Sequence, residues 1–358
     1  MISNVFKREE DAVFKLRLLY KKYGYLPYKM SKFEEYDLYA NNKDFLVSDR
    51  IITFTDEGGK LLALKPDVTL SIIKNGVDGN EKKKVYYNEN VYRVSPSSKN
   101  FKEIMQAGLE CIGEISLYDI YETVLLAVKS LETIGSDYVL DISHLGFITA
   151  ILHDKDENFK NEVVKCVGEK NIDEVKSICQ KYGYQDCESS LATLISLYGN
   201  LDFVMNNLQT ICNTNELKNA FSELNAIYLL LKENGLAGKV RFDFSLTGDI
   251  NYYNGIVFKG YVNGIAESVL SGGQYDKLAK KISKVSGAVG FAAYLDLLQN
   301  LNVDVNKYDV DTVILINDKT DVQCVINKVN ELTSNNVSVS VQQSVEKLRY
   351  KNLIDLRG

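Results

Sequence analysis

The segment Phe101–Gly113 (FKEIMQAGLECIG) alternates between two kinds of side chain at the period of a β-strand. One face carries small or apolar residues, and the other carries Gln106, Gly108 and Glu110 between two isoleucines. Such alternation is typical of an antiparallel strand with one face toward water. The isoleucines at both ends favour a second interpretation, in which the polar face is enclosed by the protein and binds a ligand.

The neighbouring segments predict the partners of this strand. Residues 84–94 form the preceding strand and residues 102–114 the strand itself, joined by a polar linker that is long for a hairpin. Further strands are expected in a hairpin at 51–66 and at 138–142, 239–246, 255–262 and 266–271. Helices are expected at 8–23, 68–73, 117–134, 276–282 and, after a lead-in at 287–291, up to residue 300. Helical periodicity from about 145 to 235 predicts a helical insertion.

This order predicts an α+β fold in which helices gather on one side of an antiparallel or mixed sheet. After residue 303 the pattern changes. A strand at 311–316, a helix at 321–333 and a strand at 337–341 are followed by a short helix and the tail LIDLRG. We therefore expect a core domain at 1–302 and a small α/β unit at 303–358, which is short for a full domain.

Composition and charge narrow the functional class. The chain has 358 residues and a net charge of -6, which argues against a nucleic-acid partner, and the run EKKK (81–84) is interpreted as a solvated turn. No segment is apolar enough for a membrane span or a signal peptide. The six cysteines include no C-x-x-C pair, and there are two histidines. We therefore expect no metal or other cofactor and a reduced, cytoplasmic location.

Three further stretches put polar groups at strand ends or beside glycine: LKPDVT (64–69), YYNENVYRV (86–94), and INYYNGIVFKGY (250–261) with SGGQYDKL (271–278). Each has an ordinary structural explanation. An aspartate between a strand and a helix is most often an N-cap, and an arginine at a strand end usually lies on the surface. Paired tyrosines pack in a core, and paired glycines form tight turns.

Taken in this order, the motifs resemble class II aminoacyl-tRNA synthetases, specifically histidyl-tRNA synthetases, over roughly residues 5–300. The opening segment is similar to the second strand of class II motif 2, and Tyr92–Arg93 to the end of its first strand. YYNGIVF (252–258) is similar to the histidine-specific tyrosine motif. SGGQYD (271–276) with GAVGFAAYLDLL (287–298) is similar to the approach to motif 3. The resemblance implies a class II synthetase-like antiparallel sheet flanked by helices.

The resemblance also implies a pocket for free histidine. Asp67, where the family has glutamate, would accept hydrogen bonds from the α-ammonium together with Thr69 and Gln106. Glu110 and Tyr253 would face the imidazole, and the glycine of the opening segment leaves room for it. A buried cation needs paired acceptors, so this chemistry is consistent. The predicted ligand-binding residues are Asp67, Thr69, Arg93, Gln106, Glu110, Tyr252, Tyr253, Gly272, Gly273 and Tyr275.

The chain departs from the synthetase pattern where the family handles ATP and tRNA. Val94–Ser95 stands where the synthetases have His-Glu, and LTGDIN (246–251) lacks the catalytic arginine. Leu297 replaces the motif 3 arginine, and Ser31 the motif 1 proline. Adenylate formation needs positive charge on the phosphates. With one arginine of three and about half an anticodon-binding domain, the chain is expected neither to make histidyl-adenylate nor to bind tRNA.

This combination resembles the synthetase paralogues that serve as regulatory subunits of ATP phosphoribosyltransferase, the first enzyme of histidine biosynthesis. The resemblance implies a non-catalytic chain that forms a self-dimer and pairs with the short-form catalytic subunit in a hetero-octamer. Such a chain is required for activity and for feedback inhibition by histidine. Two alternatives stay open: a divergent histidyl-tRNA synthetase-like ligase that activates histidine or a related amino acid, and an assembly scaffold with an unused pocket.

Overall fold

The chain divides into two compact units, Met1–Leu301 and Asn302–Gly358. The computed structural model describes residues 7–42, 51–76, 82–94, 100–247, 250, 252–283, 286–301, 308–345 and 348–357. Within these residues, no helix has the length and apolar character needed to cross a membrane. All six cysteines are free thiols.

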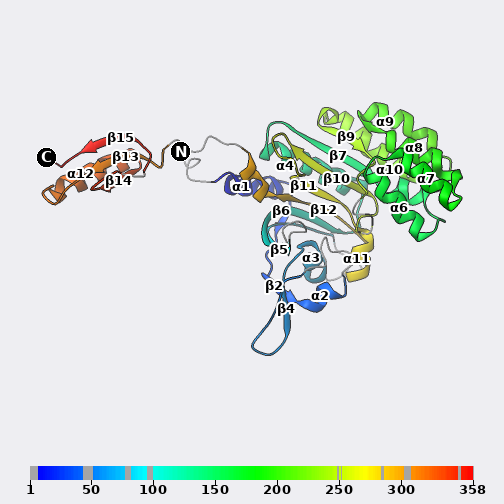
Figure 1. Ribbon diagram of the computed structural model, residues 1–358, viewed down its shortest axis with the longest axis horizontal. Coiled ribbons are helices and arrows are strands. Elements are labelled where there is room, and N and C mark those ends of the chain that lie inside the picture. The colour runs from blue at the N-terminus through cyan, green and yellow to red at the C-terminus, as the bar shows by residue number, and fades with distance from the viewer. Residues whose placement is uncertain are drawn as a thin grey trace. The chain divides into compact units, whose positions relative to one another are not determined.

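A nine-stranded sheet forms the centre of the first unit (Figure 1). Its β1–β5 and β7–β9 pairs are parallel, and its other neighbouring strands are antiparallel. The predicted α+β class is therefore confirmed. In order across the sheet, the strands are β1 (Leu26–Pro27), β5 (Lys83–Val94), β6 (Phe101–Gly113), β12 (Gly287–Tyr294), β11 (Leu270–Gln274), β10 (Ile256–Val262), β7 (Tyr138–His144), β9 (Val240–Asp243) and β8 (Tyr198–Gly199).

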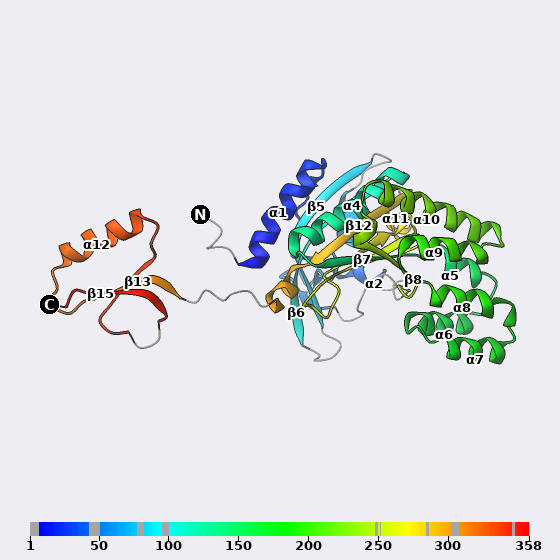
Figure 2. The ribbon, with the colours of Figure 1, turned by 90° about the horizontal axis from the view of Figure 1, so that it is seen from above.

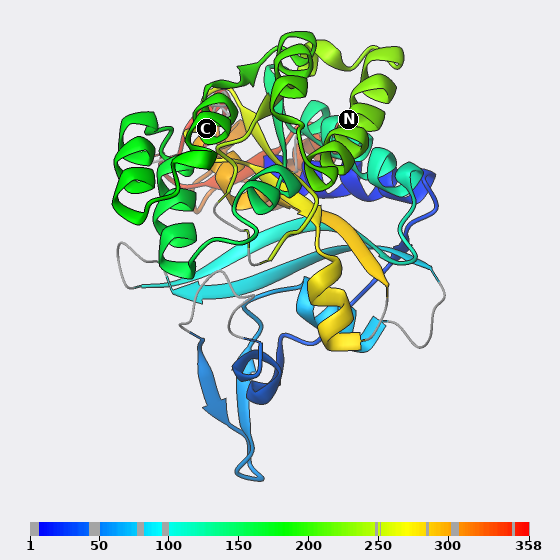
Figure 3. The same ribbon diagram turned by 90° about the vertical axis from the view of Figure 1, so that its right-hand side faces the viewer.

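Helices cover both faces of this sheet. The larger hydrophobic core lies under α1 (Arg8–Lys22) and α4 (Leu117–Ile134). On the other face, α3 (Thr69–Gly76) and α11 (Asp276–Ser283) lie against each other and close a second core (Figure 3). The expectation that helices gather on one side was wrong. Both faces of the central strands carry apolar residues, so each face needs a cover.

A helical insertion follows β7 and lies at one end of the sheet (Figure 2). It occupies the region where helical periodicity predicts it. His144, the last residue of β7, is 4% exposed and places Nε2 2.9 Å from the Glu223 carboxylate, which ties the insertion to the sheet. The elements are α5 (Gly146–Ile151), α6 (Glu157–Gly168), α7 (Ile172–Tyr182), η2 (Gln185–Cys187), α8 (Glu188–Ser196), α9 (Leu201–Leu208), η3 (Gln209–Ile211), α10 (Asn215–Glu233) and η4 (Ala237–Lys239).

A small three-stranded sheet extends from the core beside α2 (Tyr36–Ala40) (Figure 3). Its order is β2 (Phe33–Glu35), β4 (Leu61–Leu64) and β3 (Thr53–Thr55), and all its pairs are antiparallel. β3 and β4 form the hairpin that the sequence predicts. β4 ends at Leu64, directly before the segment that carries Asp67.

Two elements of the first unit differ from expectation. The strand expected at 266–271 lies at Leu270–Gln274, because residues before it form a turn in which Gly264 has φ +90°. The segment after Gly287 stays extended to Tyr294 and ends in a 3₁₀ helix, η5 (Leu295–Asn300), instead of an α-helix. Pairing with β6 on one side and β11 on the other holds this segment as a strand.

In its described residues, the second unit is a parallel three-stranded sheet with one helix. Its strands are β13 (Val310–Leu315), β14 (Val339–Gln342) and β15 (Tyr350–Asp355), in the order β14-β13-β15, and its helix is α12 (Val322–Ser334). The expectation of a short helix before the tail was wrong for the described residues, because residues 350–355 form a strand. Pairing with the buried strand β13 decides this, and local sequence does not contain that information.

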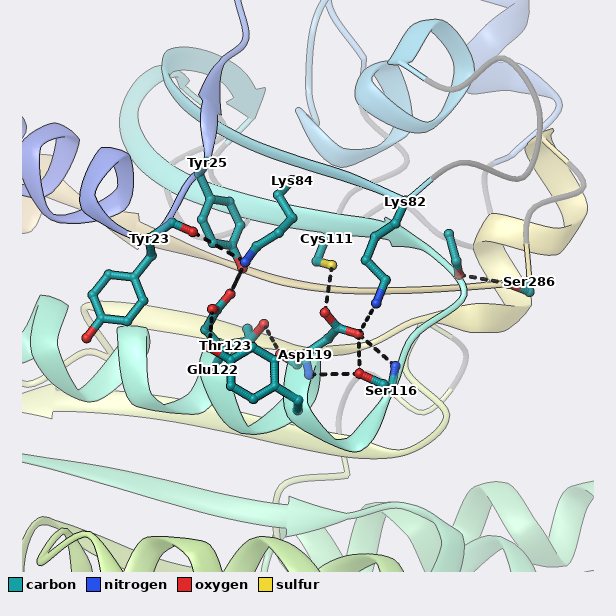
Figure 4. A network of polar contacts seen from close by, with 12 residues as sticks. Tyr23, Tyr25, Lys82, Lys84, Cys111, Ser116, Asp119, Glu122, Thr123 and Ser286 are labelled. Carbon is teal, nitrogen blue, oxygen red and sulfur yellow. Dashed lines mark hydrogen bonds and ion pairs between the residues drawn. The ribbon is translucent and has the colours of Figure 1, made fainter.

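A polar network fastens the start of α4 to β5 and β1 (Figure 4). Lys82 places Nζ 2.6 Å from Asp119 Oδ2, and Lys84 pairs with Glu122, which also accepts from Tyr25 at 3.3 Å. Ser116 N–H donates to Asp119 Oδ2 at 2.8 Å in a capping box. The interpretation of residues 81–84 as a solvated turn is therefore corrected for 82–84, and residue 81 lies outside the described residues. Two of these lysines are paired with acidic residues that are nearly buried.

The Asp119→Asn variant tests this network. Burial alone would raise the pKa of Asp119, but hydrogen bonds from Lys82 and Ser116 hold it below its ordinary value of 3.8. Its stabilising contribution is therefore present above 3.8 and is lost as the pH falls through the lower pKa of the folded chain. We expect the variant to lose about 1–3 kcal/mol at pH 7, measured by urea unfolding. Asp173→Asn, whose side chain is 97% exposed, is the control and should change little. An equal loss in both variants would contradict this role.

Candidate functional site

Glu110 lies at the centre of the predicted site. It faces Val85 of β5 and Gly290 of β12, near the middle of the sheet, and is 2% exposed. Thr69 donates to its Oε1 at 2.6 Å, and the Tyr275 hydroxyl donates to its Oε2. Burial raises the pKa of Glu110 to about 8, although both hydrogen bonds act in the opposite direction. At pH 7 the side chain is therefore mostly a neutral acid.

Asp67 and Arg93 form the second polar group of the site. Leu70 N–H donates to Asp67 Oδ1 at 2.9 Å, so Asp67 caps the first turn of α3. This agrees with the ordinary explanation of an aspartate between a strand and a helix. Asp67 Oδ2 lies 3.9 Å from an Arg93 Nη2, and Arg93 Nε donates to Pro66 O at 2.8 Å. Burial raises the pKa of Asp67 above its ordinary value, although the Arg93 charge acts in the opposite direction. Arg93 is therefore not an ordinary surface residue, because it contacts both Pro66 and Asp67.

Four tyrosines surround the two carboxyl groups. The rings of Tyr252 and Tyr253 have centroids 4.7 Å apart, and the Tyr252 and Tyr275 centroids are 5.7 Å apart. Burial raises the pKa of Tyr252 and of Tyr275 well above 10, and the nearby carboxyl groups add to this. Tyr87 of β5 was missed by the sequence analysis. It is 2% exposed, and its pKa is raised by burial first and then by Glu110.

The glycines of the site have different roles from those expected. A Cβ on Gly108 would lie 2.5 Å from the Tyr87 hydroxyl, so the space above Gly108 is filled by Tyr87. A Cβ on Gly273 would lie 2.8 Å from the Tyr253 ring. Gly272 points to the opposite face, where a Cβ would meet the Cβ of Phe291 at 2.4 Å. The structure therefore brings Gly273 to the tyrosines but does not bring Gly272 there.

Gln106 extends the same face of β6 beyond Gly108. It is 3% exposed and lies opposite Glu89 of β5. Glu89 forms an ion pair with Lys65, whose Nζ lies 2.5 Å from Glu89 Oε2 and which is 1% exposed. Neither residue was predicted. Two sequence signals could have indicated these residues: the alternation along β5 and the position of Lys65 beside Pro66–Asp67. The ion pair between Lys65 and Glu89 depends on how β5 packs against the segment after β4.

Gly290 is a further position that the sequence analysis missed. A Cβ there would lie 1.7 Å from Glu110 Oε2 and 2.4 Å from Leu109 O, so β12 can pass Glu110 only with glycine at this point. We expect Gly290→Ala to lose about 1–3 kcal/mol of stability through overpacking and to displace the Glu110 carboxylate. Chemical unfolding measures the first effect. Gly238→Ala, where no atom lies within 4 Å of the new Cβ, is the matched control. A Gly290→Ala chain as stable as the control would show that the strands separate without cost.

These groups suit a small ligand that carries N–H donors or a positive charge. Two carboxyl groups and phenol hydroxyls lie together among β5, β6, the end of β11 and the start of α3, and Gln106 lies on the same face of β6, four residues from Glu110. In the described part of the chain, no cluster of three His, Cys, Asp or Glu side chains could hold a metal ion. Val94 is buried, and Leu297 packs against the larger core. Ser95, Gly248 and Asp249, which bear on the synthetase comparison, lie outside the described residues.

Comparison with known proteins places the fold. Residues 3–298 match the family model described as histidyl-tRNA synthetase. The ATP phosphoribosyltransferase regulatory subunit of Oceanobacillus iheyensis is 26% identical over 303 residues, which is 83% of this chain and 74% of the relative.

Two solved structures have a similar fold. The ATP phosphoribosyltransferase regulatory subunit/histidyl-tRNA synthetase from Bacillus halodurans has a TM-score of 0.82 at 24% identity, over 98% of this chain and 94% of that chain. A chain of the ATP phosphoribosyl transferase (HisG:HisZ) complex from Thermotoga maritima has a TM-score of 0.63 at 20% identity, over 79% of this chain and 96% of that chain.

These matches confirm the resemblance on which the predicted site rests. The predicted class II synthetase-like sheet is confirmed by the family model and by the structural likeness. The resemblance to regulatory subunits of ATP phosphoribosyltransferase is confirmed by the curated relative. Because the family model covers residues 3–298 of the 358, the chain belongs to the histidyl-tRNA synthetase family.

Proposed function

We propose that this chain is a regulatory subunit of ATP phosphoribosyltransferase, required for the first step of histidine biosynthesis and for its control by histidine. One observation carries the proposal. Acidic and phenolic side chains are enclosed around Glu110, where the resemblance puts the amino acid, while Arg93 donates to Pro66 O and lies near Asp67. The names of the curated relative and of the Thermotoga maritima complex support the assignment.

The proposed role is non-catalytic. Arg93 is the one arginine kept from the synthetase pattern, and its Nε donates to Pro66 O. Little positive charge is therefore left to stabilise the phosphates of ATP during adenylate formation. The proposed partner is the short-form catalytic subunit, with self-dimers of this chain in a hetero-octamer. Six free thiols support a reducing, cytoplasmic location.

Histidine is the proposed ligand of the site. Asp67, Thr69 and Gln106 would accept from its α-ammonium, and Glu110 with Tyr253 would face its imidazole. A ligand changes activity only if its affinity differs between the active and inhibited assemblies. Bound histidine would therefore have to favour the inhibited one, through contacts that the active one lacks.

Reconstitution tests the proposal. The chain is co-expressed with a short-form ATP phosphoribosyltransferase catalytic subunit, and the two are purified together and sized by light scattering. We expect the pair to exceed the catalytic subunit alone in phosphoribosyl transfer to ATP, and histidine to inhibit the pair. A pair no more active than the catalytic subunit, with no response to histidine, would refute the proposal.

A second candidate is a histidine-activating ligase, favoured by the match to the synthetase family model itself. Histidine-dependent exchange of pyrophosphate into ATP separates the two. A clear exchange signal would favour the ligase, and its absence together with stimulation of the catalytic subunit would favour the regulatory role.

A further inference from the structure

The outer edge of β15 in the second unit is open. β15 pairs with β13 along one side, and none of the other described strands pairs with its second side. Most of its residues are exposed, and Leu353 is 46% exposed. An exposed edge strand without proline offers a row of unpaired backbone groups to another strand.

The backbone of β15 presents three residues to that edge. Leu356 N–H donates to Leu315 O at 2.8 Å, so the even-numbered residues before it also turn their backbone groups toward β13. Lys351, Leu353 and Asp355 then turn their N–H and C=O groups to the open side. Their side chains share one face of the sheet, because they are two residues apart.

These three residues are complementary to themselves. In an antiparallel pair of β15 strands with Leu353 opposite Leu353, Lys351 of each copy lies opposite Asp355 of the other. All three positions are then hydrogen-bonded pairs, in which the two residues exchange both N–H···O bonds. Asp355 also forms an exposed ion pair with Arg357. The cross-strand charges therefore fix the register more than they add stability.

The rest of the unit favours such a partner. It has 57 residues, Asn302–Gly358, and in α12 no residue is fully buried. Val322 and Ile326 of that helix are 69% and 45% exposed. The described part of this unit therefore leaves apolar side chains exposed, which favours association.

We infer that β15 is an interface between two copies of this chain, which joins their three-stranded sheets into one continuous sheet about a twofold axis. Each copy uses the same surface, so the contact closes on itself. The inference rests on the second unit alone and is independent of the proposed function.

Disulfide trapping in the full chain tests the register. In a Cys324→Ser background, which removes the one exposed cysteine, Leu353→Cys should form a disulfide-linked dimer under mild oxidation. Opposed residues in a hydrogen-bonded pair have Cα atoms about 5.5 Å apart, within the range of a disulfide. Lys351→Cys and Asp355→Cys alone should not link, because each lies about 14 Å from its own counterpart. The double variant carrying both should link.

Charge reversal is the second arm. Lys351→Glu, added to the Leu353→Cys chain, should slow linking several-fold, and a further Asp355→Lys should restore it, which an unfolded variant could not do. Absence of linking at Leu353→Cys would overturn the inference. Equal linking of all three single cysteine variants would also overturn it, because it would show an unregistered contact.

Discussion

The Glu110→Ala variant should bind histidine roughly 150- to 4,000-fold more weakly than the unmodified chain, since removing one partner of a buried charged or hydrogen-bonded pair costs about 3–5 kcal/mol. Glu110 is the most enclosed acid of the site and holds the Thr69 and Tyr275 hydroxyls in place. Without it, an imidazole N–H would face phenol hydroxyls, and Asp67 would be the remaining carboxyl group of the site. Isothermal titration calorimetry at pH 7 measures the loss.

Glu114→Ala is the matched control, because Glu114 follows the same strand but is exposed. It should bind histidine as the unmodified chain does. Equal binding by the Glu110→Ala chain would place histidine elsewhere. Failure of the unmodified chain to bind would favour the assembly scaffold over the regulatory subunit.

The stability of the ligand-free chain should fall as the pH rises from about 5 to about 8, and Glu110→Gln should remove much of that fall. The pKa of Glu110 is 4.5 ordinarily and about 8 in the folded chain, where burial disfavours the charged form. Between these values the folded chain holds a proton that the unfolded chain has released. Stability therefore decreases with pH by up to about 1.4 kcal/mol per pH unit from this group.

Urea unfolding at a series of pH values measures this effect. At pH 5 the glutamine variant should be close to the unmodified chain, since an amide replaces a neutral acid of similar shape. At pH 8 the variant should be the more stable of the two by several kcal/mol. Asp119 acts in the opposite direction, but only at acidic pH, so the difference between the two chains isolates Glu110. Parallel pH profiles would show that Glu110 is ionised in the folded chain.

Much of the central sheet could be predicted from local sequence. The strands at 84–94 and 102–114 lie within one residue of β5 and β6, and the helix at 117–134 is α4. These segments have strong periodicity and clear ends, such as the capping box at Ser116. The proximity of Asp67, Thr69 and Glu110 could be predicted because the motif order matches a family, and their role as ligand-binding residues stays a prediction.

The remainder depends on how strands meet. Tyr87 became a site residue because it lies opposite Gly108 in the β5–β6 register. Gly290 became one because it lies opposite Glu110. Gly272 and Gly273 are adjacent, so alternation puts one in the site and the other in the core, and the motif alone does not say which. The same holds for β15, whose state is decided by β13.

Glu110 and Cys111 are consecutive residues of β6, so their side chains lie on opposite faces of the sheet. On the far side, the Cys111 thiol lies 3.8 Å from Asp119 Oδ1, at the first turn of that helix. The same strand thus carries the candidate ligand-binding carboxyl group on one face and a contact with the start of α4 on the other. Because packed interiors transmit strain, any displacement of Glu110 would also act on the start of α4 through the adjoining peptide bond.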